Sequence, residues 1–220
     1  VVGEVVKLRD KLRWFENRPL FGKRIVVTRP RQQVEELRAQ LSGLGAEVIP
    51  FPTIEIRPPD SWKPLDQAIQ RVHQYDWLIF TSVNGVHHFF SRYRTLERDI
   101  RDLKGVRLAA IGPATERALR DLDLIVEVLP DEFKAEGLVE SLKGKVGTGS
   151  RILIVRAKVA RDVLPVELSK QGAQVDIAEA YQSVIPSISQ DALEQIFTER
   201  PVDMIVFTSS STISNLAEIL

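Results

Sequence analysis

Two apolar segments of this sequence end in the same kind of polar group. Residues 77–80 (Trp-Leu-Ile-Phe) run into Thr-Ser-Val-Asn at 81–84, and residues 204–207 (Met-Ile-Val-Phe) run into Thr-Ser-Ser-Ser at 208–211. Each apolar run predicts a buried strand, and the pattern after it predicts the start of a helix. A helix start presents backbone N–H groups without intrahelical partners, and the neighbouring hydroxyls add further donors. Both places are therefore suited to hold an anion such as a carboxylate.

Further polar groups follow other predicted strands. Arg29, Thr115 and Arg156 each come shortly after an apolar run, and the ligands of open α/β sheets bind beyond the carboxyl ends of the strands. The candidate ligand-binding residues are Arg29, Thr81, Ser82, Asn84, Thr115, Arg156, Thr208 and Ser209. Together they would suit a ligand that carries several negative charges. The same Ser, Thr and Asn side chains could instead cap helices without any ligand, and the sequence leaves this alternative open.

One tyrosine lies apart from the predicted helices. Tyr181 is one of three tyrosines and stands in the segment 179–186, which has neither helix nor strand periodicity and ends in a proline. A phenol near the polar edge of a sheet could donate a hydrogen bond to a leaving group. The alternative is a structural role, in which the ring packs against the sheet at a hinge.

The composition excludes several classes of function. The 220 residues carry 30 basic and 30 acidic side chains and no cysteine. The balanced charge gives no general attraction to nucleic acid, and the lack of cysteine excludes disulfide and thiolate sites and fits a reducing cytoplasm. No apolar run approaches the length of about 18 residues that a membrane span needs. The adjacent His87 and His88 point to different helix faces, so we expect no metal site.

Several catalytic and cofactor motifs are also missing. The sequence contains neither Gly-x-Gly-x-x-Gly nor Gly-x-x-x-x-Gly-Lys-Ser/Thr, so dinucleotide and triphosphate binding are unsupported. No His-Asp pattern accompanies Ser82 or Ser209, which argues against a serine hydrolase. Any chemistry at this protein's site must therefore depend mainly on positioning and charge.

The second half of the chain repeats the first. Thr208 and Ser209 lie 127 positions after Thr81 and Ser82, and further identities share this offset. Their first-copy members are Arg24, Ile25, Arg29, Leu37, Leu41, Ser42, Gly45, Ala46 and Val48. Two separate segments with one common offset indicate an internal duplication. The second copy stops before its counterpart of residues 108–115, so we expect about 40 further residues of that copy beyond Leu220.

Strand and helix patterns alternate along the chain. Strands are predicted near 24–28, 46–50, 77–80, 106–111 and 125–128, and helices near 64–73, 84–93, 113–120 and 134–142. A further helical stripe begins at Val34, after Pro30. This alternation is typical of parallel sheets flanked by helices. The predicted fold class is therefore α/β, with two flavodoxin-like parallel-sheet domains.

Two proline-bounded segments sit at equivalent places in the two copies. Residues 51–59 and 179–186 both follow the second predicted strand of a copy. Two connectors are needed only if the chain crosses twice between domains. We therefore expect intertwined domains, the first made of 19–52 and 185–220 and the second of 53–184.

Several motifs together resemble the uroporphyrinogen-III synthase family. They are Phe-Thr-Ser-Val-Asn-Gly at 80–85, Ile-Gly-Pro-Ala-Thr at 111–115, Gly-Ala-x-Val at 172–175, Ala-Tyr-Gln-Ser at 180–183 and Phe-Thr-Ser at 207–209. Each motif is weak alone, but their order and spacing make the set specific. The resemblance covers residues 19–220 and implies a HemD-like fold with the active cleft between two domains. Residues 2–15 resemble the end of a uroporphyrinogen-III C-methyltransferase, so 1–18 are expected to be the tail of a methyltransferase fused upstream.

The resemblance also implies a reaction. The family consists of lyases of tetrapyrrole biosynthesis, on the way to haem, sirohaem and cobalamin, that use no cofactor or metal. The implied substrate is hydroxymethylbilane, a linear tetrapyrrole with eight carboxylates. The implied reaction expels the terminal hydroxyl as water, closes the chain through a spiro intermediate and inverts ring D to give uroporphyrinogen III. We further expect a cytoplasmic monomer that binds neither nucleic acid nor membrane.

Individual roles follow from the matching motifs. Tyr181 matches the family's connector tyrosine and Thr115 its Gly-x-x-Thr hydroxyl, so both are expected to be catalytic. Ser82 and Ser209 match the edges that bind acetate and propionate groups. The remaining residues expected to bind substrate are Thr81, Asn84 and Thr208 on the same edges, with Arg29 and Arg156 added because of their charge.

Two other functions remain open on the sequence. A non-catalytic two-domain binding protein could close on a small polyanion. A two-domain glycosyltransferase would have similar architecture and would be stabilised by a nucleotide.

Overall fold

A computed structural model describes residues 13, 16–30, 34–188, 190–198 and 200–220. Most of the predicted N-terminal tail, residues 1–18, lies outside the described residues. The same is true of residues 31–33, which precede the helical stripe predicted from Val34. Within the described part of the chain, every helix is too short to cross a lipid bilayer.

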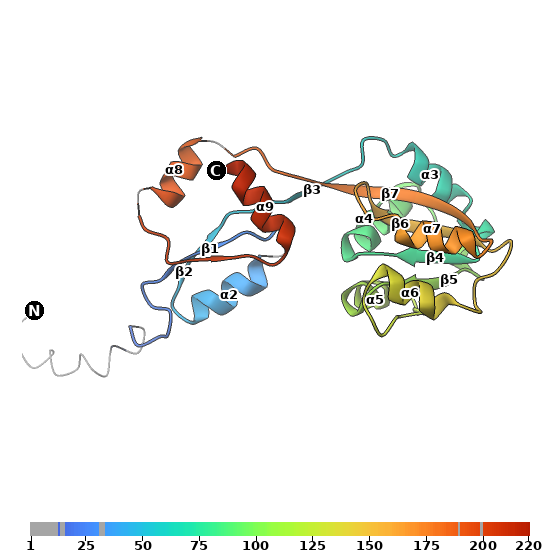
Figure 1. Ribbon diagram of the computed structural model, residues 1–220, viewed down its shortest axis with the longest axis horizontal. Helices are drawn as coiled ribbons and strands as arrows, with labels where there is room; N and C mark the ends of the chain where they lie inside the picture. The colour runs from blue at the N-terminus through green and yellow to red at the C-terminus, as the bar shows by residue number, and fades with distance from the viewer. Residues whose placement is uncertain (1–12, 14–15, 31–33, 189, 199) are drawn as a thin grey trace, which may run out of the picture. The chain divides into compact units, whose positions relative to one another are not determined.

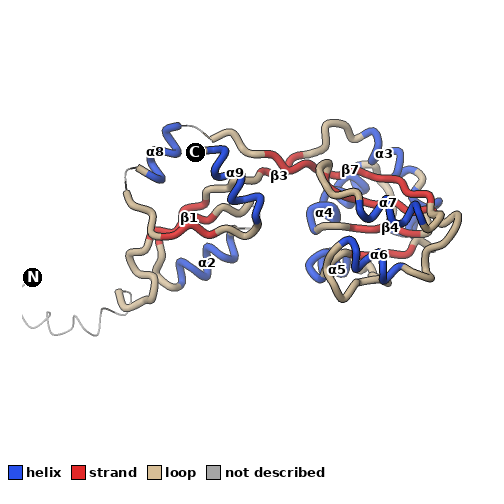
Figure 2. Tube along the Cα trace, viewed as in Figure 1, coloured by secondary structure: helices blue, strands red, loops and turns tan. Residues whose placement is uncertain are grey.

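The chain divides into two compact units (Figures 1 and 2). Unit 1 consists of Val1–Ile56 and Val184–Leu220, and unit 2 consists of Arg57–Ser183. The chain therefore passes from one unit to the other twice, once in each direction. Each crossing occurs in a segment that the sequence predicts to be an extended connector.

Unit 1 is built on a parallel sheet of three strands in the order β2-β1-β8. The strands are β1 (Arg24–Val27), β2 (Glu47–Pro50) and β8 (Met204–Val206), and the helices are α2 (Glu35–Gly43), α8 (Gln190–Phe197) and α9 (Ser210–Ile219). Ile25 and Val27 pack with Val34 and the α2 side of the sheet, whereas Val26 packs with Leu216 of α9 on the other side. Figure 1 shows the same layers, with α2 on one face and α8 and α9 on the other.

Unit 2 is built on a larger sheet in the order β3-β7-β6-β4-β5. Its strands are β3 (Glu55–Arg57), β4 (Trp77–Phe80), β5 (Arg107–Ala110), β6 (Arg151–Ala157) and β7 (Gln174–Val184). Its helices are α3 (Lys63–Gln70), η3 (Val72–Gln74), α4 (Val83–Thr95), η4 (Ile100–Leu103), α5 (Pro113–Arg120), α6 (Ala135–Leu142) and α7 (Val163–Lys170). The pairs among β4, β5, β6 and β7 are all parallel, so the carboxyl ends of these four strands meet at one edge.

Both faces of the unit 2 sheet are covered by helices. Trp77 and Ile79 of β4 pack with Leu138 and other apolar residues of α6 and α7. Phe80 points to the opposite face, where its ring lies 5.5 Å from that of Phe89 in α4. Because successive side chains of a strand alternate between faces, a strand covered on both sides must be apolar throughout, as the fully buried β4 is.

The duplication is visible in the pairing register. Ile25 pairs with Met204 in unit 1, and Ile152 pairs with Trp77 in unit 2. Ile152 is the counterpart of Ile25 and Met204 that of Trp77, at the same offset of 127 positions. The Thr-Ser strand of the first copy, β4, therefore lies in the same sheet as the first strand of the second copy, β6. In the same way β8 of the second copy lies in the sheet of β1.

A pair of aspartates fixes this exchange. Asp203 Oδ2 accepts a hydrogen bond from the backbone N–H of Arg24 at 2.8 Å, and Asp76 Oδ2 accepts one from the N–H of Arg151 at 2.8 Å. The hydrogen bond from Lys23, followed by that from the Arg24 N–H, lowers the pKa of Asp203. Both aspartates stand at the start of a Thr-Ser strand, so each sets the register of the strand pair from its amino end.

The fold class predicted from the sequence is confirmed: the strands of unit 1 and β4 to β7 of unit 2 pair in parallel, helices cover both sheets, and each sheet contains strands of both copies. One strand prediction is wrong. Residues 125–128 form no strand and contact β5 through a single bridge, from Ala109 to Val128. Ile125 is 83% exposed, because the segment leaves a turn at Asp123, whose φ is +60°, and reaches the sheet only at its end.

Arg24 offers a test of how unit 1 is held together. Its guanidinium donates to the carbonyls of Ile196 (2.6 Å), Arg200 (2.6 Å) and Gln195 (3.2 Å) at the end of α8. Arg24→Met should lower the free energy of unfolding by about 2–3 kcal/mol, because these carbonyls lose a charged donor. Urea unfolding followed by circular dichroism measures the change. The exposed Arg38→Met is the control and should cost less than about 0.5 kcal/mol; equal losses for both variants would contradict the role of Arg24.

Candidate functional site

A cavity of about 320 Å³ lies in unit 2 at the carboxyl ends of β4 and β6. Its lining residues are Thr81, Ser82, Ile111, Phe133, Lys134, Ala135, Ile154, Arg156, Ala157, Val159, Ala160, Arg161, Leu164, Pro165 and Tyr181. Of the nine predicted site residues, four are therefore brought together here, and they come from the end of β4, from β6 and from β7. The lining combines three cationic side chains, three hydroxyl groups and apolar side chains such as Ile111, Ile154 and Leu164.

Ser82 and Tyr181 form the central contact of the cavity. Their hydroxyl oxygens lie 3.0 Å apart. Ser82 also caps α4, because its Oγ accepts a hydrogen bond from the N–H of Gly85 at 3.0 Å. The capping alternative that the sequence leaves open is thus correct for Ser82, and the same hydroxyl additionally reaches the tyrosine. Tyr181 itself is only 7% exposed, so its ring is fixed by packing while its hydroxyl faces the cavity lining.

His88 packs on the ring of Tyr181. The two ring centroids are 5.7 Å apart and the planes differ by 18°, which is a stacked arrangement. Burial, followed by the charge of the neighbouring His87, lowers the pKa of His88, so its imidazole is neutral at neutral pH. This contact cannot be predicted from the sequence, because α4 and β7 are far apart along the chain and come together only in the folded unit.

Arg156 provides a buried positive charge. It is 8% exposed, and its Nη1 lies 2.8 Å from Asp162 Oδ1 and 3.3 Å from the carbonyl of Arg161. Its Nε is buried and has no hydrogen-bond partner among the described residues. A buried guanidinium is costly unless its donors are satisfied, and this one lines a cavity. The Asp162 carboxylate and the Arg161 carbonyl satisfy part of this guanidinium, which brings its positive charge to the cavity wall.

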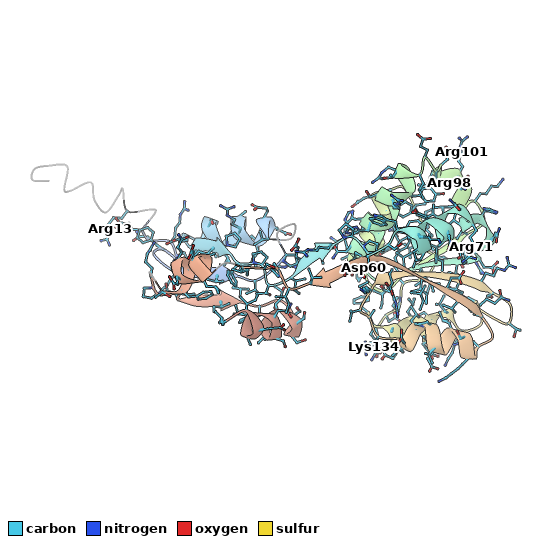
Figure 3. The ribbon with its side chains drawn as sticks, turned by 90° about the horizontal axis from the view of Figure 1, so that it is seen from above. Arg13, Asp60, Arg71, Arg98, Arg101 and Lys134 are labelled. Atoms are coloured by element: carbon cyan, nitrogen blue, oxygen red, sulfur yellow. The ribbon has the colours of Figure 1, made fainter. Side chains whose placement is uncertain are left out.

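Two further cations border the same cavity, and the sequence analysis missed both. Lys134 stands at the start of α6 and Arg161 near the start of α7. Each has an acidic neighbour, Glu132 at 2.7 Å and Glu136 at 3.4 Å. Figure 3 labels Lys134, which projects from unit 2. For Arg161 the signal that could have revealed it is its position between β6 and α7.

Lys158 is engaged elsewhere, although it follows β6 as Arg156 does. Its ammonium forms an ion pair with Asp60, which Figure 3 labels. Gln182 Nε2 donates to Asp60 Oδ1 at 3.0 Å and to the carbonyl of Pro58 at 2.9 Å. The hydrogen bond from Lys158, together with that from Gln182, lowers the pKa of Asp60. This cluster holds residues 58–60 against β7, so of the cations Arg156 and Lys158 it is Arg156 that lines the cavity.

Two predicted residues of unit 2 lie outside the cavity lining. Thr115 is 4% exposed in the first turn of α5, and Asn84 is half-buried in the first turn of α4. Thr81 lines the cavity, but its Oγ1 donates to the carbonyl of Val155 at 3.3 Å. That bond ties the end of β4 to β6, so Thr81 shapes the site more than it offers a free donor.

The other three predicted residues, Arg29, Thr208 and Ser209, belong to unit 1. Thr208 and Ser209 are exposed and Arg29 is half-buried. Ser209 stands at the N-cap of α9 with the same extended backbone as Ser82, but its side chain makes no capping hydrogen bond and lies 2.9 Å from Ser211 Oγ instead. The two Thr-Ser edges are therefore alike in backbone and different in how their serine hydroxyls are engaged.

Sequence comparisons match this chain to named proteins. A family model described as uroporphyrinogen-III synthase HemD matches residues 35–220. The uroporphyrinogen-III synthase of Synechococcus elongatus is 37% identical over 204 residues, which cover 92% of this chain and 76% of that protein. The porphyrin biosynthesis protein HemD of Ruminiclostridium josui is 30% identical over 212 residues, and the chain spans 96% of its own length but 42% of that protein.

Solved structures show the same fold. A mutant uroporphyrinogen III synthase of Thermus thermophilus superposes with a TM-score of 0.63 at 17% identity, covering 90% of this chain and 77% of that chain. A uroporphyrinogen-III synthetase of Helicobacter pylori gives a TM-score of 0.57 at 18% identity, with 90% and 78% covered. At these identities the similarity concerns the architecture of two sheets and their connections.

The unequal serines allow a matched test. Ser82→Ala should lower the free energy of unfolding by about 1–2 kcal/mol, because Gly85 loses its cap and Tyr181 its hydroxyl partner. Ser209→Ala removes an equivalent hydroxyl that caps nothing and should cost less than about 0.5 kcal/mol. Thermal or urea unfolding of both variants gives the comparison. Equal destabilisation would show that the Ser82 contacts do not form in solution.

Proposed function

This chain belongs to the uroporphyrinogen-III synthase HemD family, and from this premise we propose that it converts hydroxymethylbilane to uroporphyrinogen III, a lyase reaction. The observation that carries the proposal is the cavity of unit 2, where the Tyr181 and Ser82 hydroxyls lie 3.0 Å apart beside the buried Arg156. A phenol that can assist the loss of a hydroxyl group and a cation that can hold a carboxylate are the two groups this reaction needs.

We assign the first step to Tyr181. The terminal hydroxymethyl group is attached to an electron-rich pyrrole, which can push out the hydroxyl. As the C–O bond breaks, its electron pair goes to oxygen and the phenol transfers its proton to that oxygen, so that water leaves; the phenolate regains a proton from the ring carbon that forms the last bond. The resulting cationic methylene carbon is then attacked by a ring carbon to give the spiro intermediate, which reopens and closes with the last ring inverted.

Ser82 sets the orientation of the phenol proton in this proposal. Its Oγ already accepts the hydrogen bond from Gly85 N–H, so its own O–H is available to donate to the Tyr181 oxygen. With Ser82 as donor, the Tyr181 proton is free to point to the leaving hydroxyl. The contact is thus a hydrogen-bond relay that starts at a helix N-terminus.

Arg156 is proposed to bind one substrate carboxylate. Arg156 lines the cavity together with two further cations, Lys134 and Arg161. A carboxylate there would make charge-assisted hydrogen bonds in a site whose lining also includes the apolar Leu164 and Pro165. Fixing the acetate and propionate groups in this way would fold the linear substrate, so that the attack geometry is set before the bond forms.

The remaining roles follow from the family resemblance. Thr115 is proposed as a second catalytic hydroxyl, and the other predicted residues, Arg29, Thr81, Asn84, Thr208 and Ser209, as further carboxylate contacts. The proposal includes no cofactor. The cysteine-free composition supports a cytoplasmic location, and the methyltransferase-like residues 2–15 support a fused methyltransferase; we propose a monomer.

The alternative is a binding protein that holds the same polyanion without changing it. The Ser82–Tyr181 contact favours the enzyme, because simple anion binding has no use for a buried phenol whose oxygen is held by a second hydroxyl. A binding protein would bind hydroxymethylbilane and release it unaltered.

Tyr181→Phe tests the proposed acid. It should lower kcat for formation of uroporphyrinogen III by about a hundredfold, since a positioned proton donor is lost. The assay follows product formation from fresh hydroxymethylbilane. Tyr93→Phe is the control: Tyr93 is equally buried, but its hydroxyl donates to the carbonyl of Asp99, so turnover should not change. A Tyr181→Phe protein with wild-type turnover would remove this residue from catalysis.

Arg156→Met tests the carboxylate contact. Methionine keeps the apolar stem and removes the charge, and the released Asp162 is largely exposed and stays hydrated. KM for hydroxymethylbilane should rise about tenfold or more, the usual worth of a charge-assisted hydrogen bond. Arg120→Met, on the exposed face of α5, should leave KM unchanged. The contact is refuted by an unaltered KM in the Arg156 variant.

A further inference from the structure

Tyr181 is held at two points, and both come from α4. Its hydroxyl meets Ser82 at the N-cap of the helix, and its ring stacks on His88 in the second turn. Centroids 5.7 Å apart with nearly parallel planes fall within the range in which aromatic rings attract one another in offset stacks. One helix therefore fixes both the position of the phenol oxygen and the plane of the phenol ring.

The helix itself is firmly anchored. Phe89 and Phe90, the residues next to His88, lie 5.5 and 5.8 Å from the ring of Phe80 at the end of β4. Both phenylalanines are buried, whereas His88 is half-buried and turned to Tyr181. The phenylalanine rings thus fix α4 on β4, and His88, carried by the same helix, stacks on Tyr181 of β7.

We infer that His88 is a positioning residue for Tyr181: its imidazole face holds the phenol ring so that the hydroxyl stays against Ser82 and aimed into the unit 2 cavity. This inference rests on the catalytic role proposed for Tyr181. Small displacements of a catalytic group cost large factors in rate, so a ring that fixes the plane of the phenol contributes to kcat without touching the substrate.

The state of the imidazole fits this role. Burial and the neighbouring His87 lower the pKa of His88, so the ring is uncharged when the enzyme works near neutral pH. A neutral ring packs on the phenol face through dispersion and quadrupole contacts and adds no cation beside the oxygen that must donate a proton. An aromatic ring without charge should therefore replace histidine at this position.

The test compares steady-state kinetics of three full-length variants with hydroxymethylbilane as substrate. His88→Leu keeps the bulk but not the flat ring and should lower kcat about fivefold with little change in KM. His88→Phe restores a flat ring and should recover kcat to within about twofold of wild type. His87→Leu, the matched change at the exposed neighbouring residue, should leave both constants unchanged.

A double variant separates positioning from a general structural effect. In the Tyr181→Phe background there is no hydroxyl left to aim, so adding His88→Leu should cause no further loss of kcat. A full further fivefold loss would show that His88 acts independently of Tyr181 and would overturn the inference, as would a phenylalanine variant no faster than the leucine variant. Should His88→Leu unfold in the assay, His88→Gln provides the same comparison without an aromatic ring.

The outcomes also separate this inference from the proposed function. If Tyr181→Phe is slow but His88→Leu is as fast as wild type, only the positioning role is wrong. If Tyr181→Phe itself has wild-type turnover, the proposed role of Tyr181 is wrong, and the His88 inference falls with it.

Discussion

The exchange of strands between the two copies of the duplicated unit is the constraint on which the rest of this structure depends. β4 of the first copy pairs with β6 of the second copy, and β8 of the second copy pairs with β1 of the first copy in the same register. Asp76 and Asp203 fix the amino ends of these pairs by accepting the backbone N–H of Arg151 and Arg24. A slip of one residue would part each carboxylate from the N–H group that it binds, so the aspartates help to specify the register.

This pairing also builds the candidate site. Because β4 lies beside β6, the helix cap Ser82 and the buried Arg156 emerge next to each other, and because β7 lies beside β6, Tyr181 joins them. None of these residues is close to another in sequence, and no helix or loop alone could place them. The chemistry of the cavity is thus a consequence of strand order. The hydroxyl pair and the cation come from three parallel strands whose carboxyl ends share one edge.

The features of the fold that depend on hydrophobic periodicity, composition and internal repetition could be predicted from the sequence. The buried apolar runs predict β1, β4 and β6, and the offset of 127 positions predicts that the two Thr-Ser edges are equivalent. The sequence was not sufficient where the outcome depends on contacts between distant elements. The stacking of His88 on Tyr181 and the place of Lys134 and Arg161 at the cavity could be predicted only if the order of the strands in the sheet were known. Residues 125–128 form no strand because a turn at Asp123 leaves Ile125 in solvent. Residues at equivalent positions of the two copies also differ in their side-chain hydrogen bonds, because the Ser82 side chain caps its helix and that of Ser209 does not.

The central claim is that this chain folds a linear tetrapyrrole and directs its closure with inversion of one ring. The most direct measurement incubates the protein with freshly prepared hydroxymethylbilane and separates the uroporphyrinogen isomers after oxidation to the porphyrins. Our account predicts that the inverted isomer, uroporphyrinogen III, forms in excess and at a rate proportional to protein concentration. A product that consists of the non-inverted isomer alone, formed no faster than in the absence of protein, would contradict it.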